Sequence, residues 1–137
     1  LFLELVEDAV AQLKTQLDGV RASVTDPVEQ ARTRTLTFFR FASDNRELFR
    51  IVFGHGASFH DVVRRCQDSF INDMRESLAA GMARGAFRNA EASVWAQALI
   101  GMSLQVVSWW IDQEGVPIEE VAHSLSDLAL HGIARAT

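Results

Sequence analysis

Few residues of this chain have the types and spacing that chemistry requires. Ser58 is followed by His60 and Asp61, the three side chains of a nucleophilic triad, but triads are assembled by tertiary structure and not by sequence neighbours. The same spacing is that of a helix capping box, which explains Ser58 and Asp61 better. The sequence has no glycine-rich phosphate loop and no Gly-x-Ser-x-Gly motif. We therefore predict that the protein is not an enzyme.

Metal ligands are also sparse. A carboxylate-bridged di-metal site in a helical bundle needs two Glu-x-x-His motifs and two further glutamates, and only Glu120 and His123 form such a motif. His123, Asp127 and His131 share one helix face, which suits a transition metal but is more typical of a solvated face or a polar seam. Cys66 lies in an apolar row and is expected to be an inert core thiol. We expect no metal and no other cofactor.

The overall composition indicates one globular domain with an acidic balance. The 137 residues include 13 basic and 18 acidic side chains, a formal net charge of −5, and 48% of the residues are hydrophobic. The arginines are scattered and Lys14 is the only lysine, so the clustered positive charge that grips a phosphate backbone is missing. We predict that these residues do not bind nucleic acid themselves. One cysteine and no basic, apolar leader suit a cytoplasmic location.

Apolar residues at three- to four-residue spacing predict an all-α chain, a single-domain bundle of about six helices. Asp26, Pro27 and Glu29 form an N-terminal capping pattern, Gly85 is a C-terminal stop, and Asn89 is expected to cap the following helix. The expected helices span Leu1 to about Ala22, Pro27 to about Ala42, Arg46 to about Phe53, Ser58 to about Arg84, the segment after Asn89, and Pro117 to about Ala134.

One of these helices lacks a charged residue from position 94 to position 111. On a helical wheel its polar positions form one narrow strip, made of Gln97, Gly101, Gln105 and Ser108, so almost no polar face is left for water. The segment just reaches the length of a membrane span, but its two glutamines, two serines and one glycine argue against that role. We predict that this helix is covered on two sides, by its own domain and by a partner.

The aromatic residues are concentrated in the middle of the chain. Seven phenylalanines fall within the second to fourth helices, three tryptophans lie on the uncharged helix, and there is no tyrosine. Core packing explains most of them. The other interpretation is an apolar cavity in which a few polar groups, such as Gln105, His55 or His60, orient a ligand.

Four local strings follow one another along the chain: Leu1–Ala9 (LFLELVEDA), Leu78–Arg88 (LAAGMARGAFR), Ala96–Met102 (AQALIGM) with Trp109 and Trp110 after it, and Leu125–Ile133 (LSDLALHGI). In order and spacing they resemble the C-terminal regulatory domain of the TetR (tetracycline-repressor) family of bacterial transcription factors. The resemblance spans the whole chain. The family's N-terminal helix-turn-helix is missing from these residues, which agrees with their acidic charge.

The resemblance implies that residues 1–137 form an effector-binding and dimerisation domain that reaches operator DNA only through the missing N-terminal domain. It implies a homodimer in which the last two helices of each subunit form a four-helix bundle. The expected interface residues are Trp95, Leu99, Ser103, Val106, Trp110, Leu125, Leu128, Ala129, Gly132 and Ile133. A small apolar or aromatic effector is expected between the second and fifth helices. Its expected contacts are Phe39, Phe53, Phe59, Val63, Cys66, Phe70, Met102, Gln105 and Trp109.

The alternative is a helical protein–protein interaction module that binds no ligand and docks a different protein through its apolar helix. A third possibility, a helical-bundle metalloprotein or enzyme, predicts bound metal. Oligomeric state and the response to hydrophobic compounds distinguish the first two.

Overall fold

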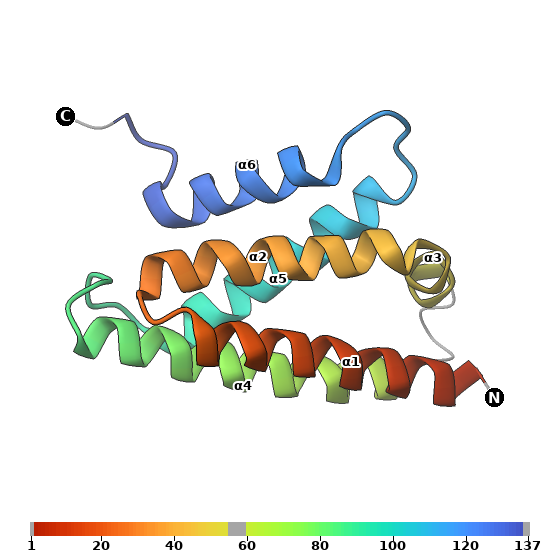
Figure 1. Cartoon of the computed structure of the whole chain (residues 1–137), viewed down its shortest axis with the longest axis horizontal. Helices are drawn as coiled ribbons and strands as arrows, with labels where there is room; N and C mark the ends of the chain where they lie inside the picture. The colour runs from red at the N-terminus through yellow and green to blue at the C-terminus, as the bar shows by residue number, and fades with distance from the viewer. Residues whose placement is uncertain (1, 55–59, 136–137) are drawn as a thin grey trace. The chain divides into compact units, whose positions relative to one another are not determined.

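The computed structural model describes residues 2–54 and 60–135, with the side chains of residues 60–63 excepted. These residues form helices and no strand, which confirms the all-α prediction. The six helices of this described part, shown in Figure 1, are α1 (Phe2–Ser23), α2 (Pro27–Asp44), α3 (Arg46–Gly54), α4 (His60–Ala83), α5 (Ala92–Trp110) and α6 (Ile118–His131).

The helices group into two compact units. Unit 1 contains residues 1–46 and 113–137 and is built from α1, α2 and α6, whereas unit 2 contains residues 47–112 and is built from α3, α4 and α5. The chain therefore passes from unit 1 to unit 2 once and returns once.

In unit 1, α2 packs along both α1 and α6 (Figure 1). Each helix contributes one apolar stripe at helical spacing to the core, as the sequence periodicity predicts. The buried apolar residues are Val6, Leu13 and Leu17 of α1, Phe39, Phe41 and Ala42 of α2, and Ile118, Val121, Ala122 and Leu125 of α6.

The start of α2 confirms the predicted cap. The carboxylate of Asp26 accepts a hydrogen bond of 3.0 Å from the backbone N–H of Glu29, and Pro27 occupies the first turn, where no backbone donor is needed. At the other end, Asn45 donates to the carbonyl oxygen of Phe41 from its backbone (3.0 Å) and from its side-chain amide (2.9 Å). The break between α2 and α3 therefore falls at Asn45 alone, whereas the sequence predicted it over positions 43–45.

In unit 2, α4 packs against α5, and a tight turn joins them. Gly85 has φ of +77°, the left-handed conformation that ends a helix, as predicted. The backbone N–H groups of Ala86 and Phe87 both donate to the carbonyl oxygen of Gly81, at 2.9 and 3.2 Å. The Phe87 ring lies directly on Gly81, where an added Cβ would sit 2.2 Å from Phe87 Cδ2. Gly81 is therefore required for this close approach.

Three predicted boundaries of the last two helices were wrong. Asn89 does not cap the uncharged helix, because α5 begins after Glu91, whose side chain makes no capping hydrogen bond. The last helix begins one residue after Pro117 and ends at His131 instead of Ala134, because Gly132 has φ of +73° and donates to the Leu128 carbonyl oxygen at 2.8 Å. The predicted cap at Ser58 lies outside the described residues. Among the described helices, none is long and apolar enough to span a membrane.

Candidate functional site

The apolar stripe of α4 is covered at one end and open at the other. Cys66, Phe70, Met74 and Leu78 recur at four-residue spacing and so share one face of the helix. Leu78 is only 6% exposed, whereas Cys66, Phe70 and Met74 are half-buried. Three apolar side chains on the same face as a core leucine are thus incompletely covered, which is unusual for a packed helix face.

The covered end is where α4 and α5 are joined. The Phe87 ring packs on Gly81, and the guanidinium of Arg88 lies 4.7 Å from the centroid of the Trp95 ring. From this joined end α5 runs obliquely to α4 (Figure 1). The axes of two helices that cross obliquely move apart on either side of their closest point. Side chains farther along the helices therefore no longer touch. Of the half-buried stripe residues, Cys66 and Phe70 lie in the half of α4 away from the joint, and Met74 lies just past its middle.

On α5, three of the predicted effector contacts share one face. Met102, Gln105 and Trp109 are spaced i, i+3 and i+7, so they lie along one side of the helix. Met102 is half-buried, Gln105 is exposed, and Trp109 is 50% exposed. This side of α5 therefore leaves an amide and two apolar side chains accessible.

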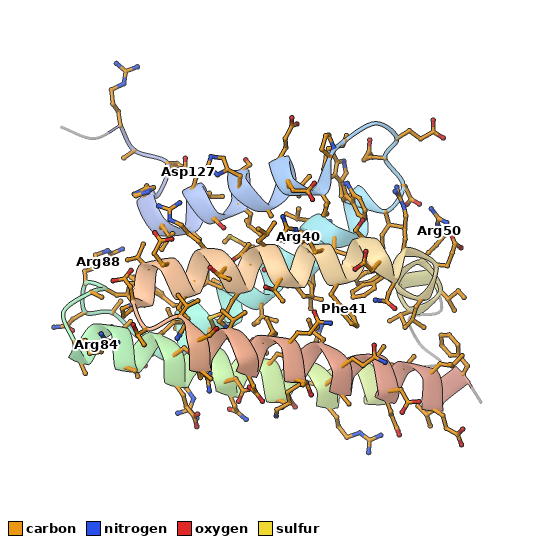
Figure 2. The ribbon with its side chains drawn as sticks, in the orientation of Figure 1. Arg40, Phe41, Arg50, Arg84, Arg88 and Asp127 are labelled. Atoms are coloured by element: carbon orange, nitrogen blue, oxygen red, sulfur yellow. The ribbon has the colours of Figure 1, made fainter. Side chains whose placement is uncertain are left out.

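The short helix α3 adds an aromatic pair and one arginine to unit 2. The rings of Phe49 and Phe53, both half-buried, are 6.1 Å apart between centroids. Arg50 donates from Nη2 to the carbonyl oxygen of Ile111 at 3.1 Å, and its Nε lies 3.8 Å from Oδ1 of Asp112 (Figure 2). Arg50 also pairs with Glu47 on its own helix. The pair with Glu47 is readable from sequence as an i, i+3 spacing, but the contact with the end of α5 is not.

The structure places most predicted effector contacts in unit 2. Phe53, Cys66, Phe70, Met102, Gln105 and Trp109 belong to α3, α4 and α5. Phe39 belongs to α2 in unit 1, where it is fully buried with its ring 5.4 Å from that of Phe38 in an edge-on arrangement. Phe59, His55 and the side chains of Val63 and His60 lie outside the described residues.

The predicted interface residues differ in exposure. On α5, Trp95, Leu99, Ser103 and Val106 are half-buried and Trp110 is buried. The exposed residues of α5 are Ser93, Val94, Gln97, Ala98, Gly101, Gln105 and Trp109. This set includes Gln97, Gly101 and Gln105, so most of the polar strip of the helical wheel lies on the outward face of α5. On α6, Leu125 is buried and Leu128 and Ala129 are exposed, and so are Gly132 and Ile133 just after the helix.

The histidine and aspartate face of α6 contacts α2. His131 Nε2 lies 3.3 Å from Nη2 of Arg32 and 3.9 Å from Oδ1 of Asp127. Arg40 of α2 pairs with Glu119 of α6 at 3.7 Å. These contacts form a polar seam along the edge of the two helices, and no group of three metal-ligating side chains occurs within the described residues.

Comparison with known proteins identifies the fold and the family. The sequence model of the family described as "Tetracyclin repressor-like, C-terminal domain" matches residues 24–133. The chain belongs to the TetR family. This match confirms the resemblance inferred from the four sequence strings. Regulators of this family are transcription factors, and their C-terminal domains generally bind small-molecule effectors and dimerise.

Solved structures of TetR regulators share the fold of this C-terminal domain. The TetR-family regulator PfmR from Thermus thermophilus superposes with a TM-score of 0.83 at 23% identity, covering 98% of this chain and 75% of that protein. A TetR/AcrR-family regulator from Thermobifida fusca gives 0.79 at 17% identity, with 97% and 73% covered. The fatty acid degradation regulator FadR from Bacillus halodurans gives 0.77 at 18% identity, with 98% and 71% covered. No curated protein sequence matched the chain significantly.

Proposed function

We propose that this domain binds a small apolar or aromatic effector in unit 2, at the open half of α4, and thereby regulates operator binding by a DNA-binding domain of the same TetR-type protein. The observation that carries the proposal is the half-buried stripe of Cys66, Phe70 and Met74 beside α5. Effector pockets are lined mainly by apolar and aromatic side chains with a few placed polar groups. This stripe supplies the apolar wall.

The surroundings of the stripe define the class of effector. Segment 94–111 contains no charged residue, and it contributes the Gln105 amide and the Trp109 ring on one accessible face. An amide can orient a single hydrogen-bonding group of a ligand, and an aromatic ring favours a flat apolar one. The Phe49–Phe53 pair of α3 adds a second aromatic surface in the same unit. Phe39, Phe59 and Val63 remain predicted contacts.

We further propose that the domain acts as a homodimer through the outward faces of α5 and α6. On the first half of the exposed face of α5, Val94, Ala98 and Gly101 are apolar or small, so a facing helix can approach closely. The second half of that face, with Gln105 and Trp109, is left to the effector. Leu128 on α6 and Ile133 just after it are exposed and would be covered by the second copy. A two-fold interface pairs one patch with itself, which suits a single uncharged face. Trp95, Leu99, Ser103, Val106 and Trp110 remain predicted contacts.

In such a dimer, effector binding changes the spacing of the two DNA-binding domains. Two half-sites lie about one helical turn of DNA apart, so a small change in spacing weakens operator binding. The coupling required between the effector and operator sites is typically about 1–3 kcal/mol. Helix α1 would transmit the change, because the resemblance to the TetR family implies that this helix directly follows the DNA-binding domain.

Effector binding is tested with 1-aminoanthracene, an uncharged aromatic probe whose fluorescence rises in apolar surroundings. We expect the 137-residue chain to bind it, and Phe70→Ala to raise the dissociation constant about tenfold through lost apolar contact. Phe2→Ala is the matched control, because it removes a half-buried phenylalanine from unit 1. Unchanged affinity in Phe70→Ala, or no binding by the unaltered chain, would contradict the proposed site.

Dimerisation is tested by light scattering of the purified chain. We expect a dimer, and we expect Gly101→Arg to produce monomers, since it places a charged side chain on the small-residue face of α5. Gln12→Arg, an exposed substitution on α1, is the matched control and should leave the dimer intact. A monomeric unaltered chain would favour the alternative, a module that docks a different protein through α5.

A further inference from the structure

Helix α3 is attached to unit 2 without contributing a buried residue. It is nine residues long, and its apolar side chains Leu48, Phe49, Val52 and Phe53 are only half-buried. A helix of this length is not stable by itself in water, so contacts with other elements must hold it in place. The other two helices of unit 2, α4 and α5, each bury core residues.

Some of the contacts that hold α3 are made with two polar groups at the end of α5, the Ile111 carbonyl and the Asp112 carboxylate. Arg50 donates to the Ile111 carbonyl oxygen at 3.1 Å and lies 3.8 Å from the Asp112 carboxylate. The carbonyl groups of the last helical turn lack partners within the helix and carry partial negative charge. A guanidinium from α3 is therefore well matched to the carboxyl end of α5, which it reaches across 61 positions of sequence.

This contact makes α3 a bridge across the open end of the α4–α5 pair. At its carboxyl end α3 stops at Gly54, and α4 begins at His60, so the two helices stay within roughly 20 Å. In the middle of α3, Arg50 binds the far end of α5 (Figure 2). The joined end of α4 and α5 is closed by Phe87 and Gly81, and the opposite end is spanned by α3.

The Arg50–Ile111 hydrogen bond is part-buried, but the ion pairs beside it are made by exposed side chains. The side chain of Arg50 is 44% exposed, and those of Asp112 and Glu47 are 75% exposed. Water competes for each of these ion pairs, so they contribute far less than apolar burial. Elements held by few buried contacts and by solvent-exposed bonds open more readily than the core of a domain.

We propose that Arg50 is a latch that holds α3 across the open end of the α4–α5 pair, and that its release controls the entry and exit of the effector. The part that concerns the effector rests on the proposed function. Arg50 is a positioning residue, because it acts on α3 and on the Trp109 end of α5 and does not itself touch the effector.

The first readout is amide hydrogen exchange, compared between α3 (positions 51–54) and the covered end of α4 (positions 78–82). In Arg50→Ala we expect exchange in α3 to rise about tenfold while exchange in α4 is unchanged, because one charge-assisted hydrogen bond and one ion pair are lost. In Arg50→Lys the exchange rate of α3 should lie between that of the unaltered chain and that of Arg50→Ala. A single ammonium cannot reproduce the two contacts that the guanidinium makes to Ile111 and Asp112. Arg40→Ala, which removes an exposed ion pair of unit 1, is the matched control.

The second readout is the association rate of 1-aminoanthracene, measured by stopped-flow fluorescence. We expect Arg50→Ala to bind and release the probe faster than the unaltered chain, also by about tenfold. A residue that only stabilises the fold would raise exchange in α3 and α4 together and leave both probe rates unchanged.

The outcomes separate the two proposals. Unchanged exchange in α3 overturns the latch, whatever the probe does. Faster exchange in α3 with unchanged probe rates overturns its control of effector access. Faster exchange in α3 when no chain binds the probe supports the latch as the attachment of α3 and overturns the effector site of the proposed function.

Discussion

The two ends of the α4–α5 pair are held by different physical means. At the joined end, Leu78 is buried, Phe87 packs on Gly81, and Arg88 lies over the ring of Trp95. At the opposite end, α3 contributes no buried residue, and Arg50 reaches the end of α5 through one part-buried hydrogen bond and one exposed ion pair. Apolar burial is strong and adds up over many atoms, whereas exposed ion pairs are weak and exchange with water. A regulatory domain that must admit a ligand can keep one end of a helix pair fixed and let the other respond.

The largest expected effect is a difference in the free energy of unfolding between two substitutions on the same face of α4, one near the joined end and one near the opposite end. Leu78→Ala should lower the free energy of unfolding by about 3 kcal/mol, because it leaves a cavity in a well-packed region. Phe70→Ala removes more carbon atoms but should cost only about 1–2 kcal/mol, since the ring is half-buried. Urea unfolding followed by circular dichroism gives both values. Equal losses, or a larger loss at Phe70, would show that the stripe is equally well packed along its length.

A smaller effect is expected where the chain turns at the joined end. Gly81→Ala should lower the free energy of unfolding by about 1–2 kcal/mol, because the new methyl group displaces the Phe87 ring from α4. Gly19→Ala is the matched control, since nothing lies within 4 Å of that helical position, and it should stabilise the chain by about 0.5–1 kcal/mol. If both substitutions stabilise the chain in thermal unfolding, the ring contact does not hold the joined end together.

The smallest effect is expected for the cation over the tryptophan ring. Arg88→Ala should cost about 0.5–1 kcal/mol, the range for an exposed cation–π contact. Arg75→Ala, an exposed arginine of α4, should change the free energy of unfolding by less than about 0.5 kcal/mol. The measurement is the urea midpoint at low and high salt. If Arg88→Ala and Arg75→Ala lower the free energy of unfolding equally, the cation–π contact does not stabilise the joined end.

Local chemistry was readable from sequence wherever a residue acts on its own neighbours. The Asp26 cap and the Gly85 stop were confirmed because a side-chain oxygen or a left-handed glycine acts within one helical turn. The Asn89 cap failed because α5 starts two residues later, after a glutamate that forms no cap bond. Gly132 was placed inside the last helix, although its positive φ ends that helix.

The candidate site was less predictable, because helix periodicity tells which residues share a face and not what covers that face. The row of Cys66 and Phe70 was visible in sequence, but its loss of coverage away from Leu78 follows from the oblique course of α5. The outward side of α5 was visible in sequence as a strip of Gln97, Gly101 and Gln105, and the dimer interface on another stripe of α5 stays a prediction. Arg50 was missed because its partner lies 61 positions away in sequence.

By itself, the sequence determined the all-α class, the six helices, most of their ends and the family, since these depend on period, caps and local strings. Tertiary structure alone decided that the same apolar row is buried at Leu78 and accessible at Phe70, and that an arginine joins α3 to the end of α5. The physical reason is that burial and charge pairing depend on distances between helices, and the spacing of residues within one helix does not contain those distances.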